Sequence, residues 1–232
     1  MQGISTVRTI VRKFPNNYAN RDENGFDLNI ECSLLPCTVV NILNESNGMY
    51  LIENKFCRGW TLCCNIALCE NIPAGEFMTV IDKSISIDGV EYFMSTKIPS
   101  ENNFLILPVY ECGKAEWKKI LSPPGVCSGF LKKTPQTIVS QAAKLLGMPY
   151  DWGEEHDSVD CSALTKYVYA TVGTQLPRNS AAQKAFAKSP EDKAEMGDII
   201  YIPGHVMIYI DDGFVLHASY SAGKVCISKM PC

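Results

Sequence analysis

Cys161 occupies a position at which a cysteine could act as a nucleophile. The apolar residues after it recur at helical spacing as far as Val172, and Gly173 is a natural stop, so the pattern predicts a helix that begins at Cys161. Either Ser158 or Asp160 could cap this helix. The thiol would then lie beside unpaired backbone N–H groups and the positive end of the helix dipole, which together favour the thiolate.

A nucleophilic thiol needs a base, and the sequence contains only three histidines. His156 lies in a polar loop shortly before Cys161, whereas His205 opens one apolar run typical of a strand and His217 closes the next. Two neighbouring antiparallel strands would bring both histidines to the helix start, with His205 as the base and His217 as the group that orients it. The spacing alone is equally compatible with a buried structural thiol and two hydrogen-bonded structural histidines.

Short motifs around these residues occur in an order that is informative. They are Pro149-Tyr150, Trp152-Gly153, Asp160-Cys161-Ser162, Leu176-Pro177-Arg178-Asn179-Ser180 with Gln183, Gly197-Asp198, His205-Val206 with Ile208-Tyr209, and His217-Ala218-Ser219. This series resembles the NlpC-type cell-wall cysteine peptidases, which are papain-like bacterial hydrolases of peptidoglycan peptides. The resemblance covers roughly the last hundred residues. Two departures stand out, because relatives usually have glycine at the positions of Glu154 and Ala163.

The resemblance implies acyl transfer to the enzyme and then to water. Cys161 would attack the peptide carbonyl, and His205, oriented by His217, would move the thiol proton to the departing amine. Backbone N–H groups at the helix start, helped by the hydroxyl of Tyr150, would stabilise the negative charge on the tetrahedral oxygen. Tyr150 could equally be a structural loop tyrosine. No cofactor and no metal is implied.

The implied substrate is a peptidoglycan stem peptide, cut between D-glutamate, linked through its side-chain carboxyl, and the following L-diamino acid. In relatives with an attached barrel, the free amino end of the peptide is bound by residues that match Asp160, Ser162 and Ser180. A carboxylate and two hydroxyls suit an ammonium group, which is costly to bury unpaired. Such a pocket would select peptides that begin with free L-Ala. The alternative is that Asp160 and Ser180 serve only as helix caps, although the binding role is favoured.

The order of the predicted elements indicates an α+β protein. After a Pro-Pro-Gly linker, residues 126–232 read as helices followed by four short strands, as in a papain-like domain whose helices pack on an antiparallel sheet. Short strands over residues 1–70 resemble a bacterial Src-homology-3-like barrel, and those over residues 71–125 resemble a second one. Relatives often carry a tyrosine just before the first barrel's Gly-Trp, whereas residues 56–58 here are Phe-Cys-Arg.

Capping patterns predict where two further helices begin. Thr134 followed by Pro135 is typical of a cap and a first helical residue. Ser180 and Gln183 have the spacing of a capping box for the helix that follows the Leu-Pro-Arg motif.

The composition is that of a globular protein, with 46% hydrophobic residues, 20% charged residues and a formal net charge of −4. Neither a basic run nor a long apolar stretch occurs, so we expect no nucleic-acid partner and no membrane partner. Eleven cysteines are an odd number for a disulfide framework, which favours mostly reduced thiols in a reducing compartment. The cysteines include no Cys-x2-Cys pair, which argues against a zinc site.

Three hypotheses for the function compete. The first is a cytoplasmic peptidase that recycles cell-wall peptides, favoured by the free thiols and by an N-terminus without the apolar core of a signal peptide. The second is an exported hydrolase of intact peptidoglycan whose signal is missing from this sequence. The third is a catalytically silent wall-binding module, favoured only by Glu154, Ala163 and the missing tyrosine. The oligomeric state and the identity of the diamino acid, diaminopimelate or lysine, are left open.

Overall fold

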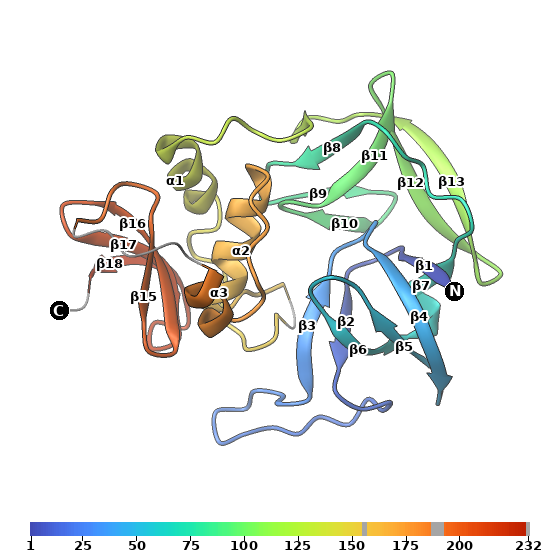
Figure 1. Cartoon of the computed structure of the whole chain (residues 1–232), viewed down its shortest axis with the longest axis horizontal. Helices are drawn as coiled ribbons and strands as arrows, with labels where there is room; N and C mark the ends of the chain where they lie inside the picture. Colours follow the sequence, from blue (N-terminus) through green and yellow to red (C-terminus); the bar gives the residue numbers. More distant parts are fainter. Residues whose placement is uncertain (155–156, 187–192, 231–232) are drawn as a thin grey trace. The chain divides into compact units, whose positions relative to one another are not determined.

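The computed structural model describes residues 1–154, 157–186 and 193–230. The chain divides into two compact units, Met1–Gly129 and Phe130–Cys232 (Figure 1). The boundaries of the three domains predicted from the sequence stay predictions. Within the described ranges, no helix is both long and apolar enough to cross a membrane.

The regular secondary structure of the first unit is almost entirely β-strand. Twelve of its strands form one continuous sheet in the order β14-β8-β11-β12-β13-β7-β1-β4-β5-β6-β2-β3, and β9 and β10 form a separate hairpin. The elements are β1 (Gln2–Ser5), β2 (Thr9–Arg12), β3 (Ile30–Leu34), β4 (Val39–Ser46), β5 (Met49–Glu53), β6 (Arg58–Leu62), the 3-10 helix η1 (Cys63–Asn65), β7 (Ile66–Leu68), β8 (Phe77–Val80), β9 (Ser84–Ile87), β10 (Val90–Phe93), β11 (Lys97–Glu101), β12 (Phe104–Glu111), β13 (Lys114–Leu121) and β14 (Val126–Ser128).

The predicted α+β class, with two separate small barrels before the catalytic part, is wrong. Among the described residues, 44% are in strands against 14% in helices, and the large sheet is curled and continuous. The prediction took its class from the C-terminal half, although most strands lie in the N-terminal half. The sheet strands before residue 70 and those after residue 76 are joined by the parallel pairing of β7 with β13, in which Lys114 lies opposite Leu68. This long-range pairing leaves no signal in the local pattern of either strand.

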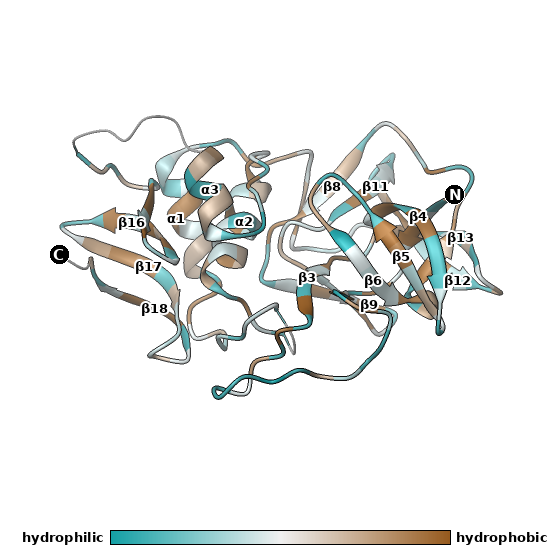
Figure 2. Cartoon of the chain, turned by 60° about the horizontal axis from the view of Figure 1, so that its bottom comes forward, coloured by the Kyte–Doolittle hydropathy of each residue, from teal (hydrophilic) through white to brown (hydrophobic). Residues whose placement is uncertain are grey.

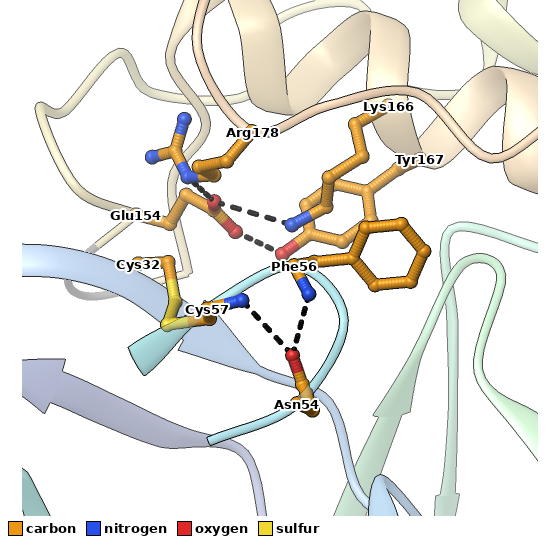
Figure 3. The surroundings of a disulfide bond; sticks show 8 residues. All are labelled: Cys32, Asn54, Phe56, Cys57, Glu154, Lys166, Tyr167 and Arg178. Carbon is orange, nitrogen blue, oxygen red and sulfur yellow. Dashed lines mark hydrogen bonds and ion pairs between the residues drawn. A yellow bond between two sulfur atoms is a disulfide. The ribbon is translucent and has the colours of Figure 1, made fainter. Parts of the chain in front are cut away.

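A disulfide joins Cys32 of β3 to Cys57, which lies just before β6 (Figure 3). The turn that holds Cys57 is organised by Asn54, whose Oδ1 accepts the backbone N–H groups of Phe56 and Cys57 at 2.9 Å each. The sequence predicted mostly reduced thiols; eight other cysteines of the described ranges are free, and this pair is the exception among them. The two partners are 25 residues apart in sequence, so spacing alone did not reveal them.

The second unit contains three helices and a four-stranded sheet within its described residues. The helices are α1 (Pro135–Ala143), α2 (Cys161–Thr171) and α3 (Ser180–Phe186); the strands are β15 (Ile199–Ile202), β16 (His205–Asp211), β17 (Phe214–Ser219) and β18 (Lys224–Lys229). All neighbouring strands are antiparallel, in chain order. Helix α2 packs against β16, β17 and α1, and apolar residues colour β16 and β17 in Figure 2.

The helix starts follow from local chemistry, with one correction. Thr134 caps α1 by accepting the N–H of Thr137 at 3.1 Å, and Pro135 is its first residue, as predicted. Helix α3 is capped by Asn179, whose Oδ1 accepts the N–H of Ala182 at 2.8 Å. The predicted capping box at Ser180 and Gln183 is therefore wrong by one residue at its start, because Asn179 is an equally good cap.

Candidate active site

Helix α2 begins at Cys161, as the sequence predicts. Asp160 is its N-cap, and the Asp160 carboxylate accepts the backbone N–H of Ala163 at 2.8 Å. Cys161 therefore lies in the first helical turn, where it is 7% exposed. His156, the third histidine, lies outside the described residues.

His205 and His217 form a hydrogen-bonded pair on adjacent strands. His205 begins β16, His217 lies in β17, and the two strands pair antiparallel. Nε2 of His205 is 2.7 Å from Nδ1 of His217, and the two rings meet edge to face at 76°. This bond occupies one nitrogen of each ring and leaves Nδ1 of His205 as the nitrogen that could receive a proton from elsewhere.

The strand that carries His205 also contacts the thiol. The backbone N–H of Val206, the next residue, hydrogen bonds to the sulfur of Cys161. Because α2 packs on β16, the helix start and the histidine pair belong to one site. The structure thus brings together the three residues predicted to act in catalysis, Cys161, His205 and His217.

The electrostatics of this site differ from the prediction of a thiolate. Burial and the adjacent Asp160 carboxylate raise the pKa of Cys161 to about 11, although the N–H groups of Val206 and Ser162 act in the opposite direction. Burial and the neighbouring His217 lower the pKa of His205 to about 4. The thiol of Cys161 and the imidazole of His205 are therefore both neutral at pH 7. The helix dipole favours the thiolate, but the negative charge of the capping Asp160 disfavours it at the same helix start. The spacing of residues in the sequence does not reveal this opposition.

Tyr150 lies close to the thiol. Burial raises the pKa of its phenol, and the charges of Cys161 and Asp160 raise it further. Its backbone forms a parallel bridge with Val159, and its ring meets that of Tyr220 edge to face at 5.8 Å between centroids. The phenol consequently stays protonated at neutral pH and can act as a hydrogen-bond donor.

Asp160 and Ser162 belong to a closed polar network with Arg178. Arg178 Nη2 donates to Asp160 Oδ2 at 2.7 Å, and Nη1 donates to Asp160 Oδ1 and to Ser162 Oγ, both at 3.1 Å. Ser162 Oγ in turn donates to Asp160 Oδ1 at 2.9 Å. Sequence reasoning placed Arg178 inside a motif but gave it no role.

Glu154 holds the opposite edge of the same guanidinium (Figure 3). Its Oε1 is 2.8 Å from Arg178 Nε and 3.7 Å from Lys166 Nζ, and its Oε2 accepts the hydroxyl of Tyr167. The Glu154 side chain is fully buried, and its backbone has a φ of 70°. A glutamate at this left-handed position is uncommon, and here its carboxylate contacts Arg178, Lys166 and Tyr167.

Ser180, the third residue predicted to bind the amino group, lies on a different helix from Ser162. It is the first residue of α3 and is half-buried. Helix α3 contacts α2 through Gln183, which donates to the carbonyl of Ser162 at 2.9 Å and accepts the hydroxyl of Thr165 at 2.7 Å. Among the described residues, the hydrogen bonds that join Asp160 and Ser162 do not extend to Ser180.

A metal centre finds no support in the described part of the chain. Within residues 1–154, 157–186 and 193–230, no three His, Cys, Asp or Glu side chains are grouped so as to hold an ion.

Comparison with known proteins gives matches to one family. The sequence model of the NlpC/P60 family matches residues 147–231. Peptidoglycan endopeptidase RipB of Mycobacterium tuberculosis is 36% identical over 118 residues, which is 43% of this chain and 49% of RipB. A probable endopeptidase of Corynebacterium glutamicum is 30% identical over 146 residues, 60% of this chain and 69% of the relative. The chain thus spans about half the length of RipB.

The fold also has a counterpart among solved structures. An NlpC/P60 family protein from Bacillus cereus matches with a TM-score of 0.78 at 17% identity, over 99% of this chain and 94% of that one. At this identity the match shows a shared fold. The extent of the match to the Corynebacterium relative, together with the family match over the residues that build the site, establishes that this chain belongs to the NlpC/P60 family.

Proposed function

We propose that the protein is a cysteine endopeptidase that hydrolyses the bond between the γ-carboxyl of D-glutamate and an L-diamino acid in peptidoglycan stem peptides. Family membership and the similarity to RipB, which is a peptidoglycan endopeptidase, support this substrate class. The observation that carries the proposal is the thiol of Cys161 beside β16, with His205 held by His217 at 2.7 Å.

The neutral thiol and imidazole suggest how the reaction begins. Cys161 would lose its proton to Nδ1 of His205 as the sulfur attacks the peptide carbonyl, so that no free thiolate accumulates. The His205 imidazolium would then give the proton to the departing amine, leaving a thioester that water hydrolyses. His217 supports this cycle by holding Nε2 of His205.

The tetrahedral oxygen would be stabilised at the start of α2. Backbone N–H groups of the first helical turn that the Asp160 cap does not occupy would donate to this oxygen, because a helix has no internal partners for them. The hydroxyl of Tyr150, kept protonated by its raised pKa, would donate a further hydrogen bond. Removal of one such donor typically lowers the rate on the order of a hundredfold.

The free amino group of L-Ala would be bound by Asp160, Ser162 and Ser180. Arg178 already contacts both oxygens of Asp160, so an incoming ammonium would meet a carboxylate whose charge is shared. We therefore expect only a modest preference for a free amine, on the order of tenfold or about 1.4 kcal/mol. This preference would make released peptides the better substrates, as in cell-wall recycling in the cytoplasm.

A second candidate function is that of an exported hydrolase of intact peptidoglycan. The Cys32–Cys57 disulfide favours it, because disulfides persist in oxidising compartments. The eight free cysteines favour the cytoplasmic alternative for the same reason. The two functions use the same reacting groups and differ in the substrate they meet.

The test is to incubate the protein with L-Ala-γ-D-Glu-diaminopimelate, with its N-acetylated form, and with intact peptidoglycan, and to identify the products by mass spectrometry. Cys161→Ala serves as the inactive control. Cys226→Ala is the matched control, because it removes another partly buried free thiol of the same unit.

Faster cleavage of the free tripeptide, lost only in Cys161→Ala, would support the recycling peptidase. Equal cleavage of free, acetylated and polymeric substrates would instead support the exported hydrolase and exclude the amine pocket. Absence of cleavage of all three would refute the peptidase proposal and favour a silent binding module. Equal cleavage by Cys161→Ala would assign the reaction to another nucleophile.

A further inference from the structure

The two remaining ring nitrogens of the histidine pair have different surroundings. Nδ1 of His205 is the nitrogen available to the thiol, whereas Nε2 of His217 is 3.0 Å from Oγ of Ser228 on β18. Ser228 is thus the third member of a chain of contacts that runs from β16 through β17 to β18. No motif in the sequence singled it out.

The register of the sheet explains why Ser228 reaches this ring. His217 lies directly opposite Cys226 in the β17–β18 pair. Residues two apart in a strand face the same side of a sheet, so Cys226 and Ser228 both point toward the face that carries the His217 ring. The sulfur of Cys226 is 3.8 Å from the same Nε2, which makes it the weaker contact.

The positions of the ring hydrogens in the two neutral imidazoles give the serine hydroxyl a role. His205 can accept a proton at Nδ1 only if its own hydrogen is on Nε2, since a neutral imidazole carries one hydrogen. That hydrogen must be donated to Nδ1 of His217, which places the hydrogen of His217 on Nε2. The Nε2–H group needs an acceptor, and the hydroxyl oxygen of Ser228 lies at hydrogen-bond distance.

We propose that Ser228 is a positioning residue, which accepts the Nε2–H of His217 and thereby selects the tautomers of both histidines that leave Nδ1 of His205 free to take the Cys161 proton. The inference rests on the proposed peptidase function for its catalytic meaning. The tautomer of each ring can be measured without any substrate. Burial lowers the pKa of both histidines, which keeps both rings neutral and makes the choice of tautomer matter at pH 7.

The experiment compares Ser228→Ala, Ser228→Thr and Cys226→Ala with the unaltered protein. Two quantities are measured: kcat and KM on L-Ala-γ-D-Glu-diaminopimelate, and the histidine tautomers from nitrogen-15 NMR of protein labelled at its histidine rings. Cys226→Ala is the matched control, because it removes the other side chain that approaches Nε2 of His217. Ser228→Thr retains the hydroxyl and suits a strand.

We expect the unaltered protein to show His205 and His217 with hydrogen on Nε2. Ser228→Ala should lower kcat about tenfold with little change in KM and should mix the tautomers of His217, by analogy with metal-binding histidines, where loss of the orienting hydrogen-bond partner has effects of at least that size. Ser228→Thr should restore both quantities, and Cys226→Ala should change neither.

A His217 ring with hydrogen on Nδ1 in the unaltered protein would overturn the inference, even if the protein is an active peptidase. Unchanged tautomers and rate in Ser228→Ala, or a larger effect of Cys226→Ala, would also overturn it. Absence of peptidase activity in every protein, with the expected tautomers present and altered in Ser228→Ala, would refute the proposed function and leave the assignment of Ser228 standing.

Discussion

Cys161 and His205 are both neutral at pH 7, and this state sets the pH behaviour expected of the site. A neutral imidazole can accept a proton, whereas the imidazolium cannot. Because burial and His217 lower the pKa of His205 to about 4, the base stays competent well below the ordinary histidine pKa of about 6.5.

We expect kcat/KM for the stem peptide to stay constant on the acid side until about pH 5 and to fall with a midpoint near the His205 pKa of about 4. The sign follows because activity requires the unprotonated ring and is lost as pH falls through its pKa. Initial rates at substrate concentrations below KM, from pH 3 to pH 8, measure this limb. A midpoint near 6.5 would show that the site does not lower the pKa of the base.

The raised pKa of Cys161 also predicts how the thiol reacts in the absence of substrate. A thiol with a pKa of about 11 reacts with iodoacetamide through a small thiolate fraction, so the alkylation rate of Cys161 should rise steadily between pH 7 and pH 9. Peptide mass spectrometry resolves Cys161 from exposed Cys64 and Cys112, whose labelling serves as an internal control. A rate that is already at a plateau at pH 7 would indicate a preformed thiolate.

At the scale of elements, one guanidinium links the loop before α2, the start of α2 and the segment before α3. Arg178 contacts Glu154 with its Nε edge and Asp160 with its two Nη groups. The approach of Glu154 Oε1 to Nε at 2.8 Å is an ion pair rather than a well-aligned hydrogen bond. Removal of one partner from a buried ion-pair network leaves an uncompensated charge. This is more destabilising than replacement of the whole network by apolar residues.

Glu154→Gln should lower the free energy of unfolding of the second unit by about 3 kcal/mol, because Arg178 and Lys166 lose a buried partner charge. Urea unfolding followed by Trp152 fluorescence measures this change. Glu195→Gln, at an exposed site of the same unit, is the control and should be neutral. A Glu154→Gln variant as stable as its control would mean that the network adds no net stability.

Asp160 makes the stability of this network depend on pH. Burial acts to raise its pKa, but the charge of Arg178 and the hydrogen bonds from Arg178, Ala163 and Ser162 outweigh burial, and the pKa is lowered. A carboxyl group with a lowered pKa in the folded state stabilises the protein above its unfolded pKa of about 3.9. That contribution is lost as pH falls through the folded pKa.

Asp160→Asn keeps a good helix cap but removes the charge. We expect this variant to be less stable at pH 7 and to lose less stability than the unaltered protein between about pH 4 and pH 2. Asp212→Asn, in the exposed turn after β16, is the matched control. Parallel acid dependences of the unaltered protein and Asp160→Asn would exclude a paired carboxylate at this position.

At the scale of the whole molecule, the N-terminal unit depends on contacts between residues far apart in sequence. Its continuous sheet places Val11 and Ile52 in one apolar cluster and Val80, Ile98 and Leu105 in another. The Cys32–Cys57 disulfide fastens β3 to the segment before β6 and closes a loop of moderate length. Such a link stabilises mainly by restricting the unfolded chain.

Cys32→Ser should lower the stability of the N-terminal unit by about 3 kcal/mol under non-reducing conditions, as expected for a loop of this length. Thermal unfolding measures the change, and non-reducing peptide mapping identifies the linked pair directly. Cys64→Ser removes an exposed free thiol and is the control. Free Cys32 and Cys57 in protein prepared without reductant would refute the disulfide.

The sequence by itself determined the local part of this protein. The helix that begins at Cys161 and the strands that carry His205 and His217 follow from periodicity, which depends on near neighbours. The sequence limited the cap of this helix to Ser158 or Asp160, and the structure shows Asp160. The family resemblance was likewise carried by short ordered motifs. These local features could be predicted because they are determined by side chains that are neighbours in sequence.

Only the tertiary structure decided the remainder. The join of β7 to β13, the Cys32–Cys57 pair and the approach of Ser228 to His217 unite residues that no local pattern connects. The raised pKa of Cys161 likewise depends on burial, and the shared charge of Asp160 depends on where Arg178 lies. Burial and Coulomb interactions are functions of distance in space, so helical spacing correctly placed the thiol but could not predict its charge.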